Sequence, residues 1–373
     1  MSFFVAALIW LALLGAALLL VWALYRQPPS VELSRELPTG GFEGHTLPLT
    51  VRVKLRSRLP TRVVIQDEPP RRVVADIVPV IQATLFGELH TQTGTTLTLN
   101  RRGVYQWQGA TLSWADPLGL FWRSVPLDTP QRLEVYPATH GLILPDLLRP
   151  LLSEGALSRS LGLEDPLSLR GAREYSVGDP PSRIHWRLSA RGAGLMVREL
   201  ERTASSSLSI YLDLQHASEV YLESAVRLAA SLVQEAQQLG LAVSVATDTG
   251  ASPSGRNYES QRLALVALAE AAPTTAPPHI PAPPLGSNLI VLTQRADDKL
   301  VGQAITARGR ASRVSIVALP EGFYLEPGEK PRKQWASPPE TVRALAARAG
   351  TLAEFGVLVY LLRGNQSVLK LGV

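Results

Sequence analysis

Arginine and aromatic side chains are concentrated in one stretch of the chain, from Arg170 to Arg202. The stretch holds seven arginines and no lysine, interleaved with one tyrosine, one histidine, one tryptophan and four acids. A guanidinium group presents five donors in a fixed plane, so it suits bidentate pairing with carboxylates better than a mobile ammonium does. The stretch therefore indicates either an internal ion-pair network that locks two parts of the fold together or a docking surface for an acidic partner.

Two local geometries fit the middle of this stretch. In the first, Asp179 or Ser182 caps a helix whose first turn contains proline. Arg183, Arg187 and Arg191 then recur at every fourth position and share one helix face. In the second, the segment is a strand that points Arg187 and Arg191 outward, because short segments are ambiguous by periodicity alone. The capping residues favour the helix, and both geometries place guanidinium groups in a row.

Motifs of enzymes are missing from the chain. It has no phosphate-binding P-loop, no dinucleotide fingerprint and no HExxH, and its six histidines lie far apart. The absence of cysteine excludes disulfides, thiolate metal sites and a cysteine nucleophile. No GxSxG nucleophile elbow is present, although a triad built from distant residues stays open as an alternative. We therefore expect a non-catalytic protein that needs no cofactor.

The charge balance is mildly basic. Lys and Arg number 37 against 32 Asp and Glu, which gives a formal net charge of +5 over 373 residues. Basic residues are scattered among acids and no nucleic-acid-binding signature is present, so we expect no nucleic-acid partner. The same balance suits a surface that faces anionic lipid headgroups.

The N-terminal segment predicts a membrane anchor. Residues 3–25 contain no charge, and at 1.5 Å per residue they reach about 35 Å, enough to cross a hydrocarbon core of about 30 Å. Trp22 and Tyr25 stand at one end, where interfacial aromatics are expected. A cleaved signal peptide fits less well, because no basic residue precedes the run. Arg26 and Arg35 follow it, which favours a single-pass protein in the cell membrane with the bulk of the chain in the cytoplasm.

Residues 30–140 predict a β-rich, sandwich-like domain of antiparallel strands. Alternating apolar and polar residues start at Thr50 and again at Thr96, and short runs are separated by glycine and proline. Its tryptophans, Trp107, Trp114 and Trp122, are expected in the core, since aromatic side chains dominate core burial.

Residues 207–373 predict an α/β domain. The expected strands are 207–213, 241–247, 288–293, 313–318 and 356–362, and the expected helices are 219–239, 259–271, 296–308 and 338–348. Ser218 and Gly240 have the types that begin and end a helix. Alternation of strands and helices implies a mostly parallel sheet covered on both faces. The proline-rich segment 273–284 is expected to be an exposed linker.

The whole chain is thus expected to be an α+β multidomain protein. It comprises a membrane anchor over 1–29, the β-rich domain over 30–140, a connecting region over 141–206 that carries the arginine-rich motif, and the α/β domain.

Several motifs together carry a resemblance to a known family. The residues from Arg173-Glu-Tyr to Ala190-Arg191 resemble the hallmark of the domain of unknown function 58 family. Upstream, the stretches that start at Arg35, Arg102 and Asp116 (Arg-Glu-Leu-Pro, Arg-Gly-Val-Tyr and Asp-Pro-Leu-Gly-Leu-Phe) resemble motifs of its β domain. The hallmark positions, expected to bind a partner or to hold the structure, are Arg173, Glu174, Tyr175, Gly178, Asp179, Arg183, His185, Trp186, Arg187 and Arg191.

The resemblance implies a fold and a partner. It implies a membrane protein with a β-rich domain, a von Willebrand factor A-like α/β domain and association with MoxR-type AAA+ ATPases. In such α/β domains the first strand typically ends in Asp-x-Ser-x-Ser, whose oxygens hold Mg²⁺. The aligned residues here are Asp213, Gln215 and Ala217, and the alanine offers no oxygen. We therefore expect no metal at this degenerate site.

These observations predict a non-catalytic, membrane-anchored scaffold or adaptor. Its expected partners are membrane lipid, through residues 3–25, and an AAA+ ATPase that acts in the assembly or remodelling of protein complexes. The alternative is a hydrolase that acts on cell-envelope or peptide substrates.

Overall fold

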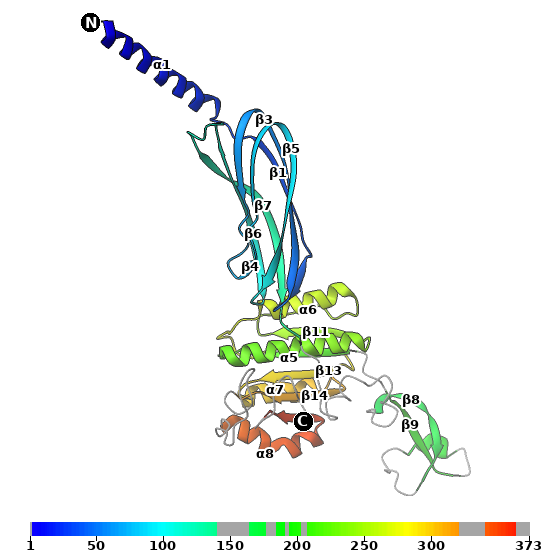
Figure 1. Cartoon of the computed structure of the whole chain (residues 1–373). Helices are drawn as coiled ribbons and strands as arrows, with labels where there is room; N and C mark the ends of the chain where they lie inside the picture. The colour runs from blue at the N-terminus through cyan, green and yellow to red at the C-terminus, as the bar shows by residue number, and fades with distance from the viewer. Residues whose placement is uncertain are drawn as a thin grey trace. The chain divides into compact units, whose positions relative to one another are not determined.

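The computed structural model describes residues 2–139, 164–176, 184–190, 194–202, 207–320 and 340–362. The chain divides into two compact units, Met1–Pro137 and Ala138–Val373. Figure 1 shows the elements of each unit, which are described separately below.

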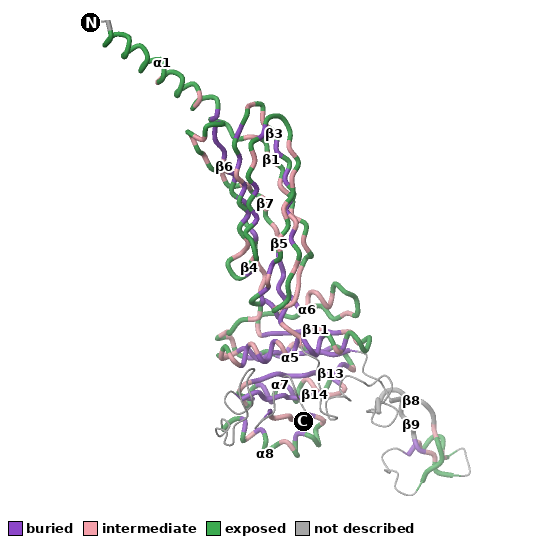
Figure 2. The backbone as a smooth tube through the Cα atoms, viewed as in Figure 1, coloured by how far each residue is buried: buried purple, intermediate pink, exposed green. Residues whose placement is uncertain are grey.

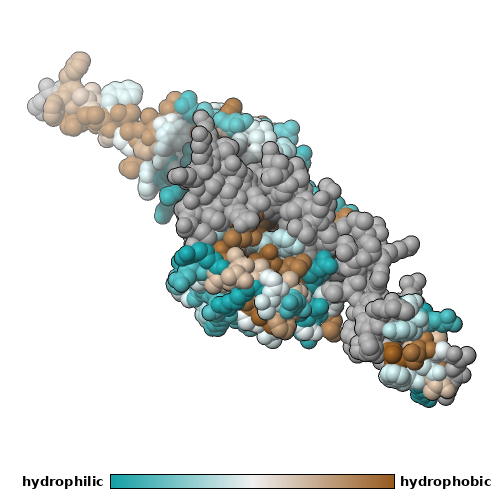
Figure 3. All heavy atoms as spheres, turned by 90° about the horizontal axis from the view of Figure 1, so that it is seen from below, coloured by the Kyte–Doolittle hydropathy of each residue, from teal (hydrophilic) through white to brown (hydrophobic). Residues whose placement is uncertain are grey.

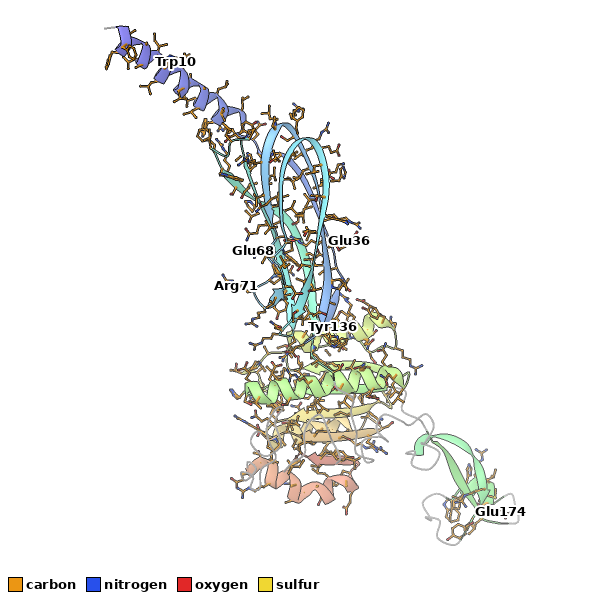
Figure 4. All side chains as sticks on the ribbon, viewed as in Figure 1. Trp10, Glu36, Glu68, Arg71, Tyr136 and Glu174 are labelled. Atoms are coloured by element: carbon orange, nitrogen blue, oxygen red, sulfur yellow. The ribbon has the colours of Figure 1, made fainter. Side chains whose placement is uncertain are left out.

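Helix α1 (Ser2–Leu24) begins the first unit and is exposed along its length (Figure 2). The segment Phe3–Leu24 is long and apolar enough to cross a membrane. The hydrophobic surface of this helix is visible in Figure 3, and Trp10 is labelled on it in Figure 4. An apolar helix that is exposed over most of its length is costly in water, because its hydrophobic surface stays hydrated.

Seven strands follow α1 and form one sheet in the order β2-β7-β6-β3-β5-β4, with β1 paired to β3. Their bounds are β1 Ser30–Glu36, β2 Gly40–Phe42, β3 Thr46–Gln66, β4 Val73–Ala75, β5 Val80–Leu99, β6 Gly103–Ala115 and β7 Arg123–Tyr136. The pairing is antiparallel except between β2 and β7. β3 and β5 make a long two-stranded ribbon whose register shifts between Ser57 and Thr61.

β3 changes partner along its length. Its first part pairs with β1, and its last residues pair with β6. Alternate β3 side chains, such as Val51, Val53 and Leu55, are buried in one hydrophobic core together with residues of β5, β6 and β7. The alternation of apolar and polar residues in the sequence therefore predicts which face of this strand is buried.

Two of the three tryptophans expected in the core are there. Trp107 is 1% exposed and Trp114 is 5% exposed. The prediction for Trp122 is wrong, because its side chain is 50% exposed. Trp122 lies in the connection between β6 and β7, outside any strand, so the alternation of a sheet does not direct it inward.

A buried ion pair lies inside the β-sheet unit. Arg35 donates from Nε and Nη2 to the two carboxylate oxygens of Asp67, at 2.7 and 2.8 Å, and both side chains are 1% exposed. Trp107 donates from Nε1 to Asp67 Oδ1 at 2.9 Å, and the Arg35 guanidinium lies 4.7 Å from the centre of the Trp107 ring. Arg35 also donates to the carbonyl of Thr129 at 2.5 Å. The pair therefore ties β1 and β7 to the residue that follows β3.

The second unit contains a six-stranded sheet in the order β12-β11-β10-β13-β14-β15. Its elements are β10 Ser207–Leu212, α5 Glu219–Gln238, β11 Ala242–Thr247, β12 Gly250–Ala251, α6 Tyr258–Glu270, β13 Asn288–Thr293, α7 Asp298–Ala307, β14 Arg313–Ala318, α8 Glu340–Glu354 and β15 Val357–Leu361. All neighbouring strands are parallel except β11 and β12. Every residue of β10 and β13 is buried, as strands covered on both faces must be.

The strands and helices predicted for this unit are confirmed within a few residues, except that α8 extends to Glu354. Ser218 caps α5 by accepting from Tyr221 N at 3.2 Å, and Gly240 follows the helix with φ +69°. Both terminal signals act as their residue types predict.

The proline-rich segment 273–284, expected to be an exposed linker, is only partly exposed. It forms neither helix nor strand, as expected, but Pro278, Ile280 and Pro283 are buried. Gln303 of α7 holds its backbone, accepting from Ile280 N and donating to Pro278 O, both at 2.8 Å. Side-chain burial and backbone hydrogen bonds replace regular structure here, so the segment is a packed strap.

Residues 164–202 include a separate pair of antiparallel strands, β8 (Glu164–Glu174) and β9 (Met196–Arg202). A single helical turn, α4 (Trp186–Ser189), stands between them. Residues 141–206 were expected to be a connecting region that carries the arginine-rich motif, and a strand was an alternative only for the middle of that motif, so β8 and β9 were not anticipated.

We predict that Asp67→Ala lowers the free energy of unfolding by about 3–5 kcal/mol, because it leaves Arg35 charged and buried without its carboxylate partner. The double variant Arg35→Met/Asp67→Leu should lose less than the single variant, since both charges are then removed. Urea denaturation of the full chain in detergent measures both values. Glu68→Ala is the control, because Glu68 is the exposed neighbour (Figure 4), and its cost should stay within about 0.5 kcal/mol. Equal losses in Asp67→Ala and Glu68→Ala would contradict this account.

Candidate functional site

The sheet of the second unit has a point at which its strand order reverses. β10 lies in the middle, and the chain continues first to β11 on one side and later to β13 on the other. In open parallel sheets, ligands bind in the crevice outside the carboxyl ends of the two strands at this switch point. The residues that follow β10 and β13 are therefore the first place to look for a binding site.

Asp213 directly follows β10 at the switch point, and it is 8% exposed. Its Oδ2 accepts from Thr293 Oγ1 at 2.7 Å, and its Oδ1 accepts from Gln215 N at 3.3 Å. Thr293 is the last residue of β13, and its Oγ1 also accepts from Ala296 N at 3.0 Å. The carboxylate and hydroxyl thus bond to each other and to neighbouring amides.

Tyr221 joins the two strands beneath this carboxylate. Its hydroxyl contacts the carbonyl oxygens of Asp213 at 2.9 Å and Leu292 at 3.0 Å, and the side chain is fully buried. Asp213 N also donates to Leu292 O at 2.9 Å. The backbones of β10 and β13 are therefore joined up to their carboxyl ends.

A second acid, Asp248, bonds to the residues on either side of Leu212 and Asp213. Asp248 accepts from the Tyr211 hydroxyl and from Leu214 N, the latter at 3.1 Å. The Tyr211 hydroxyl in turn accepts from His279 N of the strap at 2.9 Å. Burial, followed by the hydrogen bond to Asp248, raises the pKa of Tyr211 far above its usual range. Tyr211 therefore remains a neutral donor at physiological pH.

The strap also covers the loop that follows β10. Thr274 N donates to Leu214 O at 3.0 Å, and His216 N donates to Thr274 O at 2.8 Å. His216 and Ala296 have φ values of +49° and +55°, in the left-handed region that side chains rarely adopt. Their amide hydrogen bonds, to Thr274 and Thr293 respectively, hold the two strained residues in place.

The pKa of Asp213 is raised, chiefly because burial disfavours the charged carboxylate. The hydrogen bonds from Thr293 and Gln215 oppose this shift, and the negative charges of Asp248 and Asp297 add to it. A cation would have the opposite effect and would lower the pKa. The groups that shift this pKa, besides burial itself, are hydrogen-bond donors and acids.

The expectation that Asp213, Gln215 and Ala217 hold no metal stays a prediction. No group of three or more histidine, aspartate or glutamate side chains within the described parts of the chain is placed to hold an ion. The backbone N–H of Gln215 donates to Asp213, and Ala217 has no oxygen in its side chain. The one carboxylate at the expected metal position already accepts two hydrogen bonds.

The hallmark residues form a second candidate site, on the β8–β9 hairpin. Trp186 is 65% exposed and Tyr175 is 37% exposed, while Leu188 and Leu195 are 40% and 45% exposed. Arg173, Glu174 and Arg187 are also exposed, and Figure 4 labels Glu174 on this hairpin. The hairpin therefore presents aromatic, aliphatic and arginine side chains on its surface.

His185 organises the single turn of α4. Its Nδ1 accepts from Leu188 N at 3.2 Å, and its carbonyl accepts from Ser189 Oγ at 3.1 Å. His185 N donates to Met196 O at 2.7 Å, which attaches the turn to β9. The helix is therefore shorter than predicted, and its cap is His185 rather than Asp179 or Ser182.

The predicted row of arginines can be followed only in part. Arg187 is described, whereas Arg183 and Arg191 lie outside the described residues, as do Gly178 and Asp179. Arg173 donates from Nη1 to the carbonyl of Glu174 at 3.1 Å. Whether the row holds the fold together or binds a partner stays a prediction.

Sequence reasoning missed Thr293, Tyr221 and Asp248 at the switch point. Each is a common residue type, and each reaches Asp213 or its neighbours only through the fold. The one available signal was position: Thr293 and Asp248 lie at or just after the ends of predicted strands, where parallel strands bring side chains together.

The fold thus defines an open, mostly parallel α/β domain joined in sequence to an antiparallel β unit. Residues 171–306 match the family described as "Protein of unknown function DUF58". This match supports the resemblance to that family over those residues, which run from β8 to α7. No curated protein matches the chain with significant similarity.

Three solved structures are similar to part of the chain. The CARDB domain of the Pyrococcus furiosus PF1109 protein, in complex with di-metal ions, is 13% identical over 29% of this chain and 93% of that chain, with a TM-score of 0.19. A Listeria innocua beta-glucosidase is 15% identical over 30% of this chain and 16% of its own, with a TM-score of 0.16. Its complex with glucose gives 15% identity, 29% and 16% coverage, and a TM-score of 0.15. At these TM-scores the likenesses define neither the fold nor the function of this chain.

We predict that the unfolding free energy contributed by Asp213 rises as the pH falls. Because its pKa in the folded protein is above the ordinary 3.8, the folded state binds more protons than the unfolded state in the window between these two values. Stability should therefore increase through this window as the pH falls and then level off below 3.8. Asp213→Asn should lack this increase, whereas the exposed control Asp128→Asn should keep it. Parallel urea titrations from neutral pH to about pH 4 test this, and identical slopes for wild type and Asp213→Asn would contradict it.

We also predict that Mg²⁺ does not stabilise the protein. A ligand that binds the folded state raises the transition temperature with its concentration, so about 10 mM MgCl₂ should shift it by less than about 1 °C. Matched NaCl at the same ionic strength is the control in thermal unfolding of the full chain. A rise that saturates with Mg²⁺ and is lost in Asp213→Asn would contradict the assignment of a degenerate site.

Proposed function

We propose that this protein is a membrane-anchored, non-catalytic scaffold whose hallmark hairpin docks an AAA+ ATPase of the MoxR type. Helix α1 spans the cell membrane once, and the bulk of the chain lies in the cytoplasm. The scaffold brings the ATPase to the membrane, where it assembles or remodels protein complexes. The observation that carries the proposal is the contrast between a switch point closed by its own hydrogen bonds and a hairpin that exposes large side chains.

The closed switch point supports a structural role for the α/β domain. Asp213 and Thr293 bond to each other, and Tyr221 joins the backbone beneath them. In the strand order β12-β11-β10-β13-β14-β15, β10, which comes first in the chain, is central. β12, which comes third in the chain, pairs antiparallel with β11. That order supports a von Willebrand factor A-like domain that has lost its metal, and an antiparallel sandwich-like domain precedes it in the chain.

The exposed hairpin supports protein docking. Tryptophan, tyrosine and arginine are the residue types that dominate binding energy at protein interfaces. Trp186, at 65% exposure, lies next to Arg187 on α4, and Tyr175 follows β8. A large aromatic surface left in water is unfavourable for the isolated protein, so a partner that covers it gains the hydrophobic contribution.

Arginine, in place of lysine, supports an acidic partner surface. Arg173 and Arg187 are exposed on the hairpin, and the stretch from Arg170 to Arg202 contains no lysine. Paired forks of guanidinium and carboxylate give a defined orientation as well as attraction. An ATPase that must act on a membrane-bound client requires such a fixed orientation.

The exposed apolar helix supports the anchor. Phe3–Leu24 is long enough for one crossing, and the window that defines the span has none of its residues buried. Arg26 lies two residues after the end of α1, and basic residues next to a span favour the cytoplasmic side.

We predict that Trp186→Ala weakens binding of a purified MoxR-type ATPase by about tenfold or more, the loss typical of an aromatic residue central to an interface. Biolayer interferometry with the full chain in nanodiscs measures the dissociation constant, with the ATPase loaded with a slowly hydrolysed ATP analogue. Arg187→Glu should have a similar effect and should also reduce the dependence on salt. Tyr258→Ala is the matched control, because Tyr258 of α6 is 67% exposed, and its dissociation constant should stay within about twofold.

The proposal fails if the Trp186→Ala chain remains folded and binds the ATPase as tightly as the wild type does. It also fails if the purified full chain itself cleaves peptide or cell-envelope substrates, since the protein would then be a hydrolase.

A further inference from the structure

The connection between β6 and β7, residues 116–122, exposes apolar side chains that the docking function does not use. Leu118 is 77% exposed, Leu120 is 52% exposed and Trp122 is 50% exposed. This loop is the Asp-Pro-Leu-Gly-Leu-Phe motif followed by tryptophan. Surface leucines are ordinary when they stand alone, but three exposed large apolar residues within five positions mark an interaction site.

Internal hydrogen bonds hold the loop in its shape. The carboxylate of Asp116, which is 1% exposed, accepts from Leu118 N at 3.0 Å and from Leu120 N and Phe121 N at 2.9 Å each. Gly119 adopts φ +76°, and its amide donates to Asp116 O at 2.9 Å. The acid satisfies the backbone of the loop and leaves the leucine side chains outside. The apolar exposure is therefore built into the loop by its backbone geometry.

The loop lies next to the end of α1. Trp114, just before it, donates from Nε1 to Tyr25 O at 3.0 Å. Arg123, just after it, donates to Trp22 O at 3.3 Å, and its guanidinium lies 5.0 Å from the centre of the Trp22 ring. Both flanks of the loop thus contact the last turn of the helix or the residue that follows it.

A second exposed aromatic residue lies at the same end of the β-sheet unit. Phe86, on β5, is 75% exposed and stands between Leu85 and Gly87, which pair with Thr61 and Ser57 of β3. Between those two β3 residues lies Pro60, whose carbonyl accepts from the Tyr25 hydroxyl at 2.7 Å. We call Phe86, Leu118, Leu120 and Trp122 the apolar rim.

The charges around the apolar rim are mainly positive. Arg58 and Arg62 are exposed on β3. The guanidinium of Arg62 lies beside Gly119 of the loop, with Nη1 3.2 Å from the position that a Cβ atom would take there. The acid in the loop, Asp116, is buried, while Glu88 beside Gly87 is exposed and paired with Lys54 at 3.3 Å. Exposed guanidinium groups beside apolar and tryptophan side chains are the combination that binds the interface of an anionic bilayer.

We propose that the apolar rim inserts into the headgroup region of the anionic leaflet from which α1 emerges. This inference rests on the proposed membrane anchor and adds a second point of contact to it. The bilayer is the occupant because the rim is continuous with the end of α1, which would bring it to the lipid surface. Two contacts with the bilayer would fix the orientation of the β-sheet unit, where a single helix would leave it free to rotate.

The absence of cysteine allows each position to be labelled alone. Leu118→Cys, carrying the environment-sensitive fluorophore NBD, is placed in the full chain and reconstituted into phosphatidylcholine vesicles with about 30% phosphatidylglycerol. We expect quenching by lipid-borne nitroxide, and an iodide quenching constant about fivefold or more below that of a water-exposed label. Replacing Arg58 and Arg62 by glutamate should reduce the lipid quenching, because the anionic headgroups then repel the rim.

Val74→Cys is the matched control. Val74 is 50% exposed and pairs with Thr98, eleven residues along β5 from Gly87, or roughly 36 Å at 3.3 Å per residue. Its label should remain open to iodide and beyond the reach of nitroxide. An equal response at positions 74 and 118 would overturn the inference.

Leu13→Cys, in the middle of α1, separates failure of the rim from failure of the anchor. If the label at 13 is quenched by lipid and the label at 118 is not, the anchor stands and the rim inference is wrong. If neither is quenched, the anchor itself fails. A label at 118 that is protected from iodide but untouched by lipid nitroxide would identify a protein occupant, such as a second copy, and would also contradict the inference.

Discussion

The bond between Asp213 and Thr293 is the interaction on which the arrangement of the switch point depends. It joins the ends of β10 and β13 at the position where an open parallel sheet offers its binding crevice. The carboxylate is buried, and each of its oxygens already accepts a hydrogen bond, one from Thr293 and one from Gln215 N. The strap reinforces the closure through Thr274 and His279. We therefore propose that function lies on the outer surface, chiefly on the β8–β9 hairpin.

Two buried acids in the first unit likewise accept several hydrogen bonds each. Asp67 holds Arg35 and Trp107 inside the sheet, and Asp116 holds the backbone of an exposed loop beside α1. Asp116 belongs to a motif that the sequence analysis singled out, whereas Asp67 was not singled out, and the effects of the two acids differ. One fixes a core, while the other presents apolar side chains to the surroundings. The contacts of Tyr25 and Arg123 connect that loop to the helix, so the anchor and the β-sheet unit meet through specific hydrogen bonds.

Much of the fold could be predicted from local signals. The apolar run of α1, the alternation in β3 and the cap and stop of α5 at Ser218 and Gly240 are each determined by neighbouring residues. Trp122 could not be placed, because its exposure follows from a loop that Asp116 organises. The burial of Pro278 and Ile280 was missed because their partner, Gln303, is distant in sequence. For the site, Asp213 was found by position, but its bond to Thr293 follows only from the strand order.

Amide hydrogen exchange at the switch point tests the central claim most directly. In the full chain in nanodiscs, the amides of Gln215 and Ala296 are bonded to Asp213 and Thr293. The account predicts that peptides covering 213–218 and 293–296 exchange slowly, close to the rate of β10 itself, with no change on addition of Mg²⁺. Exchange as fast as in an open loop, or protection that arises only when Mg²⁺ is added, would show that the crevice is open and would contradict the account.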